Sequence, residues 1–201
     1  NVADVLAGTY PSTNPILAAL QQGVLLIDNN SVIEHAKTAV QVLSKDANYD
    51  YVQQSGGGLV IAKNSNFKNN RRSVEFMRYI SDFSSSVFED CQFFVDDDYR
   101  YEKTHTEDVG LGYQFTMWDV HGVDILGCKF RDDRTGIDIS EWDDAKSIGG
   151  IYSIDADYTL RSYKIGNSSS WKRSRFDNLY RAVKSIETCE TMGSIRLDEN
   201  D

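Results

Sequence analysis

The chain has 201 residues, 40% of them hydrophobic and 26% charged, so it can bury a sizeable core as one large domain or two small ones. The 31 acidic and 21 basic residues give a formal net charge of −10, which disfavours nucleic acid and anionic lipid as partners but suits Ca²⁺. No stretch approaches the 18 apolar residues of a transmembrane helix, so we expect no membrane insertion. The 11 Tyr and 9 Phe, with plentiful Asn, Ser and Gly, favour a β-rich fold with polar turns.

Residues 1 to 24 contain both prolines of the chain, Pro11 and Pro15, and a short apolar segment that Gly23 would end. We expect a lead-in or capping segment over one end of the remaining structure. The chain has neither an initiator Met nor a basic-then-apolar leader. We therefore expect it to be a fragment of a longer polypeptide.

A repeat begins at residue 25, where Leu25 to Val42 lies without a gap on Leu59 to Phe76, 34 residues later. The shared pattern is Ser or Cys, any residue, Phe or Ile, five residues, and then a small residue followed by Val or Ile. Further copies are centred on Cys91-Gln92-Phe93, Cys128-Lys129-Phe130 and Ser174-Arg175-Phe176. The third copy lacks the small-apolar pair, and we interpret residues 96 to 112 as an inserted loop. Gly150 to Ile154 alternates as a strand does.

Each copy holds short apolar runs between turn-forming residues and cannot bury its own apolar face, whereas stacked copies can. Residues 25 to 201 are therefore predicted to form an all-β, right-handed parallel β-helix, a pectate-lyase-like solenoid with long inserted loops. The predicted inward columns contain Ile33, Phe67, Phe93 and Phe130 in one file, and Val40, Val74 and Ile137 in another. Asn30 and Asn64 are expected to stack at one turn.

A β-sandwich and a propeller are the rival folds, and both favour tight antiparallel hairpins. The chain contains no Asn-Gly or Asp-Gly dipeptide, which argues against them.

The three cysteines, Cys91, Cys128 and Cys189, are too few and uneven in number for a disulfide scaffold. Cys91 and Cys128 share a column of the repeat with Ser residues, which indicates buried structural thiols. Stacked equivalents can also fall within the ~4.4–6.8 Å between Cα atoms that a disulfide needs, so a bridge is the alternative.

Four segments of the sequence resemble those of secreted, surface-associated β-helix proteins of Bacteroidota that the type IX secretion system exports. They are Leu25 to Ala39, Ser73 to Phe76, Thr116 to Val120 and Gly150 to Ala156. The resemblance implies a right-handed β-helix, an extracellular, cell-surface location, and the secretion machinery and other domains of the same polypeptide as partners. It implies no catalytic motif.

Acidic clusters are the candidate metal ligands, because Ca²⁺ prefers several oxygen ligands. The candidates are Asp96, Asp97, Asp98, Asp132 and Asp133, with Glu102, Glu107 and Asp108 close behind the first three. The predicted stacking places Asp96 on the same edge as Asp132 and Asp133. Such carboxylates can bind Ca²⁺ or act as the acid pair of a glycosidase, and the alternative is a solvated acidic loop.

Histidine and aromatic residues give weaker signals. His105 and His121, with Glu107 and Asp119, lack the tight spacing of a metal site. Trp118, Trp142 and Trp171, together with the tyrosines, can stack on sugar rings, and the alternative for Trp118 is packing in or against the coil.

Two functions follow from this sequence. The first is a non-enzymatic structural or adhesive module of a secreted bacterial surface protein. The alternative is a carbohydrate-active enzyme, a polysaccharide lyase or glycoside hydrolase, or a glycan-binding module on the same scaffold, with Arg131 and Arg134 beside Asp132 and Asp133 as the arrangement closest to that of a lyase.

Overall fold

The computed structural model describes residues 24–28, 30–43, 58–77, 86–100, 112–136, 148–164, 170–186 and 195–198. Most of their strands belong to three parallel sheets, here named A, B and C. Sheet A contains β1 (Val24–Ile27), β4 (Leu59–Lys63), β7 (Val87–Glu89), β10 (Val123–Leu126), β13 (Tyr158–Arg161) and β18 (Ile195–Asp198). Sheet B contains β2 (Val32–Glu34), β5 (Asn66–Lys68), β8 (Gln92–Val95), β11 (Lys129–Asp132) and β16 (Arg175–Asp177). Sheet C contains β3 (Val40–Leu43), β6 (Val74–Met77), β9 (Tyr113–Trp118), β12 (Gly149–Ile154) and β17 (Arg181–Ile186).

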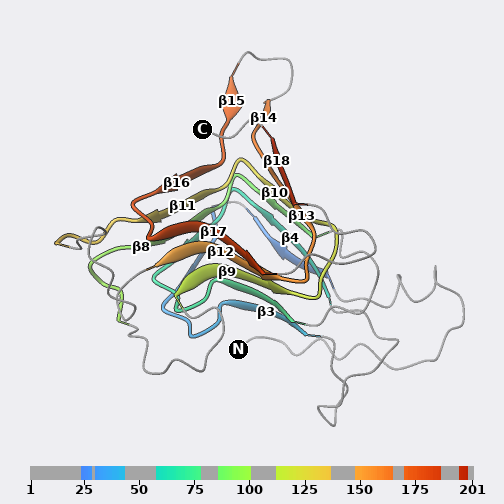
Figure 1. Cartoon of the computed structure of the whole chain (residues 1–201). Coiled ribbons are helices and arrows are strands. Elements are labelled where there is room, and N and C mark those ends of the chain that lie inside the picture. Colours follow the sequence, from blue (N-terminus) through green and yellow to red (C-terminus); the bar gives the residue numbers. More distant parts are fainter. Residues whose placement is uncertain are drawn as a thin grey trace, which may run out of the picture.

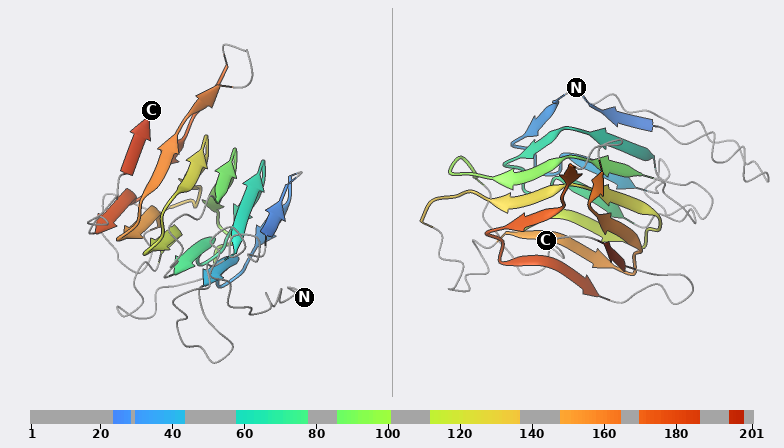
Figure 2. Two further views of the ribbon diagram at one scale, coloured as in Figure 1. Left: turned by 90° about the vertical axis from the view of Figure 1, so that its right-hand side faces the viewer. Right: turned by 90° about the horizontal axis from the view of Figure 1, so that it is seen from above.

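The chain visits the sheets in the order A, B, C and then returns to A one strand further along, so each circuit forms one coil of a solenoid. The strands in the described part of the chain form five successive coils, and β18 begins a sixth. Figure 1 shows the three sheets as the sides of a prism, and the colour gradient in Figure 2 follows the stacking of the coils. This architecture confirms the predicted parallel β-helix. Within the described ranges, no helix is long and apolar enough to cross a bilayer.

The corners between sheets carry residues with a left-handed backbone. At the corner between sheets A and B these are Asn30, Asn64, Asp90 and Gly127, with φ of 61°, 47°, 53° and 60°. Asn and Asp tolerate this conformation better than other non-Gly residues because their short polar side chains bond locally. Asn64 Nδ2 also donates to Asn30 Oδ1 at 2.9 Å, which confirms the predicted amide stack. The turns therefore need no Asn-Gly pair.

The core is built from columns of equivalent residues in successive coils. The predicted aromatic column is confirmed, and it contains Ile33, Phe67, Phe93, Phe130 and Phe176. The four Phe rings stack with neighbouring centroids 4.8, 4.7 and 5.0 Å apart and nearly parallel planes. Three of these Phe side chains are fully buried. Rings stacked at the strand spacing pack closely against one another in the interior.

The second predicted column is confirmed only in its first step. Val40 pairs with Val74, and the next positions of this column are Phe115, Ile151 and Val183. Ile137, which was expected here, lies outside the described residues, and the register gives its place in the fourth coil to Ile151. In the third and fourth coils the chain therefore makes a long excursion between sheets B and C.

A second excursion lies in the fifth coil, between sheets A and B. There β14 (Tyr163–Lys164) and β15 (Trp171–Lys172) pair as an antiparallel hairpin, which projects from the prism in Figure 1. Its base packs on the neighbouring coil at Gly127, where an added Cβ would lie 2.9 Å from Tyr163 and Lys172. Lys172 Nζ is also 2.6 Å from Asp90 Oδ2. The proposed capping segment lies outside the described residues except for its last residue, Val24, which begins β1.

The A–B corner also contains the cysteines. Cys91 and Cys128 are free, buried thiols in the column that Ser65 and Ser174 share. The column repeats one hydrogen bond, because each member donates to a carbonyl of the preceding strand: Ser65 to Lys63 O at 2.8 Å, Cys91 to Glu89 O at 3.5 Å, Cys128 to Leu126 O at 3.6 Å and Ser174 to Arg161 O at 2.9 Å. A hydrogen bond from Cys128 lowers the pKa of the Cys91 thiol, whereas burial raises the pKa of Cys128 well above its usual value. Cys189 lies outside the described residues.

Candidate functional site on the outer face of sheet C

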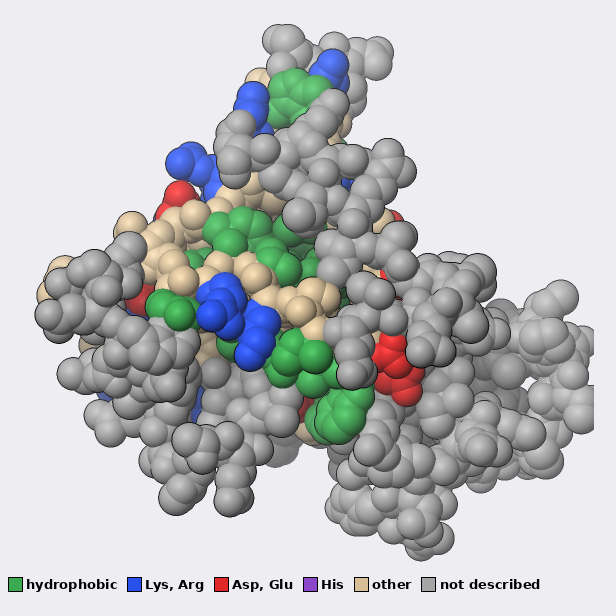
Figure 3. Space-filling view, in the orientation of Figure 1, with side chains coloured by type: hydrophobic (Ala, Val, Ile, Leu, Met, Phe, Trp, Pro, Cys, Tyr) green, Lys and Arg blue, Asp and Glu red, His purple; other side chains and the backbone are tan. Residues whose placement is uncertain are grey.

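Sheet C presents two columns of outward side chains beside its buried ones. Successive residues of a strand point to opposite faces, so the residues between the inward positions point away from the core. The first outward column contains Gln41, Glu75, Thr116, Tyr152 and Lys184. The second contains Met77, Trp118, Ile154 and Ile186. In Figure 3, basic side chains (blue) lie beside hydrophobic ones (green) over the strands of this sheet.

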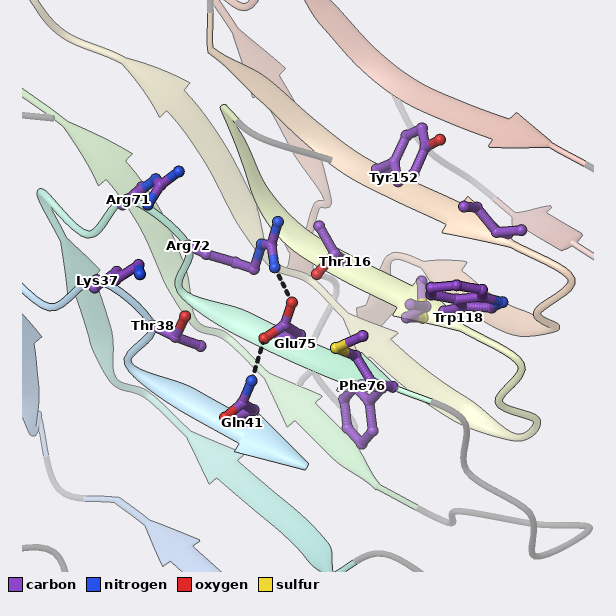
Figure 4. A pocket seen from close by; sticks show the side chains of 13 residues that line it. Lys37, Thr38, Gln41, Arg71, Arg72, Glu75, Phe76, Thr116, Trp118 and Tyr152 are labelled. Atoms are coloured by element: carbon purple, nitrogen blue, oxygen red, sulfur yellow. Dashed lines mark hydrogen bonds and ion pairs between the residues drawn. The ribbon is translucent and has the colours of Figure 1, made fainter. Parts of the chain in front are cut away.

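A hollow of about 530 Å³ lies on this face, across β3, β6, β9 and β12. We call it the sheet C groove. The described side chains that give it its chemistry are Lys37, Arg71, Arg72, Glu75, Trp118 and Tyr152. Figure 4 shows Lys37 and Arg71 at one end and Trp118 at the other. The groove is therefore cationic at the B–C corner and aromatic further along the strands.

Glu75 is at the centre of the groove and is held from two sides. One of its carboxylate oxygens pairs with Arg72 Nη1, and the other accepts a hydrogen bond of 2.6 Å from Gln41 Nε2 (Figure 4). Although it is on the outer face of the sheet, Glu75 is only 5% exposed. A carboxylate with both oxygens bonded is suited to holding Arg72 in position rather than to accepting a proton from a substrate.

The aromatic end is organised around Tyr152. Its ring centroid lies 5.2 Å from that of Tyr113, and Lys184 Nζ lies 5.2 Å from the Tyr152 centroid. Tyr113 can lie flat on β12 because Gly149 has no side chain, and a Cβ there would come within 2.3 Å of the Tyr113 ring. Burial raises the pKa of Tyr152, so its hydroxyl stays protonated and able to donate. Trp118, on the neighbouring strand, extends this apolar surface.

A buried polar network fixes the backbone that carries the two arginines. Asn70 is fully buried: its side-chain oxygen accepts from Ala36 N and its side-chain nitrogen donates to Ile33 O, both at 2.9 Å. Arg71 N donates to Ala36 O at 3.0 Å, and Arg72 O accepts from Ala39 N at 3.0 Å. The corners of the first two coils are thereby joined immediately behind Arg71 and Arg72.

The predicted acidic candidates lie on the other side of the B–C corner. The register of β8 with β11 places Asp96, which follows β8, next to Asp132 and Asp133, as the predicted stacking required. Asp96 is 2.8 Å from Lys68 Nζ and accepts a 2.7 Å hydrogen bond from Asn69. The bond from Lys68 is the main reason that the pKa of Asp96 is lowered to about 2. Asp97 accepts from the backbone and hydroxyl of Thr135. Both carboxylates thus tie neighbouring coils together.

The other acidic candidates are paired with the arginines of the same strand and loop. Asp132 forms a two-pronged ion pair with Arg134, at 2.9 and 2.6 Å, and is nearly buried. Asp133 lies 3.1 Å from Arg131 Nε, and the Arg131 guanidinium is 4.7 Å from the centroid of the Phe94 ring. Asp98 is exposed. Nowhere among the described residues do three or more His, Cys, Asp or Glu side chains gather as metal ligands would.

The remaining candidates do not form one site. His121 Nδ1 lies 3.1 Å from Asp157 Oδ1, a partner that the sequence did not suggest, and Asp119 occupies a left-handed corner. Trp171 is on the projecting hairpin, with its ring centroid 4.8 Å from Lys164 Nζ. Glu102, His105, Glu107, Asp108 and Trp142 lie outside the described residues.

Sequence reasoning identified Trp118, included Tyr152 only among the tyrosines in general, and missed Arg71, Arg72 and Glu75. A signal for the cations was present, because the 34-residue repeat aligns Lys37 with Arg71 just before the inward Val40 and Val74. The outward column was harder to see because its five members are of five different types.

The fold and the groove define a parallel β-helix protein that presents cationic and aromatic side chains on one sheet. No protein family, no curated protein and no solved structure matches the chain significantly. Its β-helix architecture is therefore shown by the structure alone.

Proposed function

We propose that this protein is a non-enzymatic adhesive module whose sheet C groove binds a carbohydrate chain. The observation that carries the proposal is the position of the partly exposed Trp118 beside the Arg72–Glu75–Gln41 cluster in a single hollow, which the largely buried Tyr152 (6% exposed) also lines. Aromatic rings pack against the apolar faces of sugar rings, and a few fixed polar groups orient a ligand in such a site. Both kinds of group are present on adjacent strands.

The arrangement favours binding over catalysis. Hydrolysis of a glycosidic bond generally uses two carboxyl groups about 5–9.5 Å apart. Among the described residues that line the groove, Glu75 is the one carboxylate, and its two oxygens are already bonded to Arg72 and Gln41. A lyase or hydrolase on this scaffold is the alternative that an activity assay excludes or establishes.

A secreted, cell-surface location and export by the type IX secretion system belong to the same proposal. Their support is the resemblance of the four sequence segments to Bacteroidota surface proteins. An adhesive module on such a polypeptide would present its groove to polysaccharides outside the cell.

The test is a binding survey by affinity electrophoresis and calorimetry with a panel of soluble polysaccharides. Trp118→Ala and Tyr152→Ala are each expected to weaken binding roughly ten-fold, about 1.4 kcal/mol. Trp171→Ala is the matched control, because Trp171 is on the hairpin and does not line the groove. Equal losses for Trp118→Ala and Trp171→Ala would place the binding site elsewhere. Release of shortened or unsaturated sugars by the wild-type chain would establish the enzyme instead.

A further inference from the structure

The sheet C groove has a local charge opposite to that of the chain. Its described lining contains three cations, Lys37, Arg71 and Arg72, against the single carboxylate of Glu75, whereas the whole chain has a net charge of −10. Because the overall charge opposes non-specific attraction of polyanions, a cationic lining has to act locally. We propose that the groove selects acidic polysaccharides, in which carboxylate or sulfate groups bind at Lys37, Arg71 and Arg72. This inference rests on the proposed carbohydrate-binding function.

The cations are repeated along the solenoid axis. The first two coils are offset by 34 residues on both sides of the B–C corner, which makes Lys37 and Arg71 equivalent positions of neighbouring coils. Equivalent residues of neighbouring coils are about 4.8 Å apart. The aromatic residues Trp118 and Tyr152 belong to the third and fourth coils. A polymer crossing the groove obliquely would therefore meet the cations at the B–C corner first and the aromatic rings further along the strands next (Figure 4), over three coil spacings or about 14 Å in the axial direction.

Arg72 and the backbone of both arginines are also preorganised. The guanidinium group of Arg72 is fixed by Glu75, and its side chain is only 15% exposed. The backbone of Arg71 and Arg72 is joined to the first coil through the buried Asn70 and through two backbone hydrogen bonds. Ser73 extends this network by donating to Gln114 Oε1 at 2.7 Å, and both side chains are fully buried. Charged groups on a rigid backbone lose little conformational entropy when an anion binds.

Arginine and lysine have different roles in such a site. The planar guanidinium fork matches the geometry of a carboxylate or sulfate, whereas the ammonium of Lys acts as a point charge. Arg72 is braced by Glu75 at the floor of the groove, and Lys37 is exposed at its rim. We expect Arg71 and Arg72 to orient the anionic group and Lys37 to strengthen attraction.

The experiment compares binding to two matched pairs of polymers at low salt. The pairs are polygalacturonate with its methyl ester, and dextran sulfate with dextran, so that each pair differs in charge on one backbone. The wild-type chain is expected to bind the acidic member of at least one pair ten-fold or more tightly than the neutral member. The pair that shows the preference identifies carboxylate or sulfate as the bound group. High salt is expected to reduce this preference because it screens exposed charges.

The variants are Lys37→Gln and Arg71→Gln, with Lys129→Gln on the outer face of sheet B as the control. Each groove variant is expected to weaken binding of the preferred acidic polymer five- to ten-fold and thereby to reduce the difference in affinity between the acidic and the neutral member. A preference that all three variants retain would overturn the proposal. Equal binding of both members that still depends on Trp118 would overturn charge selection and leave the carbohydrate groove standing. Failure to bind any polysaccharide, in these pairs and in the wider panel, would overturn both proposals.

Discussion

Phe93 and Phe130 stack face to face across the third and fourth coils, with ring centroids 4.7 Å apart and planes inclined by 10°. Their centroid separation equals the spacing of adjacent strands, so the rings and the backbone hydrogen bonds repeat with the same period. Phe67 and Phe176 continue the stack on either side. The aromatic column is thus continuous through the interior, and each of its rings packs against the rings of the neighbouring coils.

Removing one ring from this column should be costly. Phe93→Ala is expected to lower the free energy of unfolding by about 3–5 kcal/mol, because a buried Phe leaves a cavity that the stacked coils cannot close. Urea unfolding followed by circular dichroism measures this change. Phe94→Ala, which removes the adjacent outward ring, is the control and should cost clearly less. Similar losses for the two variants would show that the aromatic column does not dominate the core.

The left-handed corner at Asn64 gives a second prediction. Asn64 has φ 47° and donates to Asn30, so Asn64→Ala forces a Cβ-bearing residue without local hydrogen bonds into this conformation. We expect Asn64→Ala to be about 1–2 kcal/mol less stable than Asn64→Gly, because Gly adopts positive φ without strain. Both variants lose the side-chain bond, so their difference isolates the backbone. Equal unfolding midpoints would contradict this explanation of the corner.

The A–B corner column predicts which substitution the buried thiols tolerate. Ser65 and Ser174 make in their coils the hydrogen bond that Cys128 makes to Leu126 O. Cys128→Ser is therefore expected to change the free energy of unfolding by less than about 1 kcal/mol, since the hydroxyl finds the same acceptor. Cys128→Val, which keeps an apolar side chain and removes the donor, is the comparison. A Ser variant that is less stable than the Val variant would show that apolar volume, not the hydrogen bond, determines this column.

Asp96 makes stability depend on acid pH. Lys68 and Asn69 lower its folded-state pKa to about 2, below the value of about 3.9 for an unfolded Asp. The stabilisation is complete above about pH 5, decreases as the pH falls through 4 towards 2, and is absent below about pH 2. Asp96→Asn is expected to show a shallower loss of stability than the wild type between pH 5 and 2. Chemical unfolding at several pH values measures this, with Asp98→Asn as the charge-matched control. Parallel curves for wild type and Asp96→Asn would contradict it.

The sequence was sufficient for the scaffold because the coils repeat residue types at inward positions. The Ser/Cys and Phe/Ile columns could be read directly, since a buried, repeating environment restricts which side chains fit. The third strand of each coil was harder to place. In the third and fourth coils, long excursions separate Phe115 and Ile151 from the aromatic column in sheet B. Gly136-Ile137 matches the expected small-apolar pair because it follows Phe130 after five residues, but the register gives this place to Ile151.

The candidate site was not predictable in the same way. Glu75 and Tyr152 belong to an outward column whose members share a position and no chemistry, so periodicity does not reveal them. The acidic residues stood out by composition, yet Asp96 and Asp132 each bond to a neighbouring basic side chain. The predicted stacking of the coils thus placed these carboxylates near one another correctly but could not predict which basic side chain each carboxylate binds.

The alternation of sheet C separates two tasks between adjacent residues. Val74 and Phe76 must match the buried residues of the coils above and below, whereas Glu75, between them, has to match its outward partners, Arg72 in the same coil and Gln41 in the neighbouring one. Residues of the outer column can therefore be replaced while the stack keeps its register, provided that bonded neighbours such as Gln41 and Glu75 are changed together. For protein engineering, the solenoid is a scaffold whose outward positions recur at a regular spacing and can be substituted. New recognition surfaces can be introduced by substituting outward side chains at intervals of one strand spacing, about 4.8 Å.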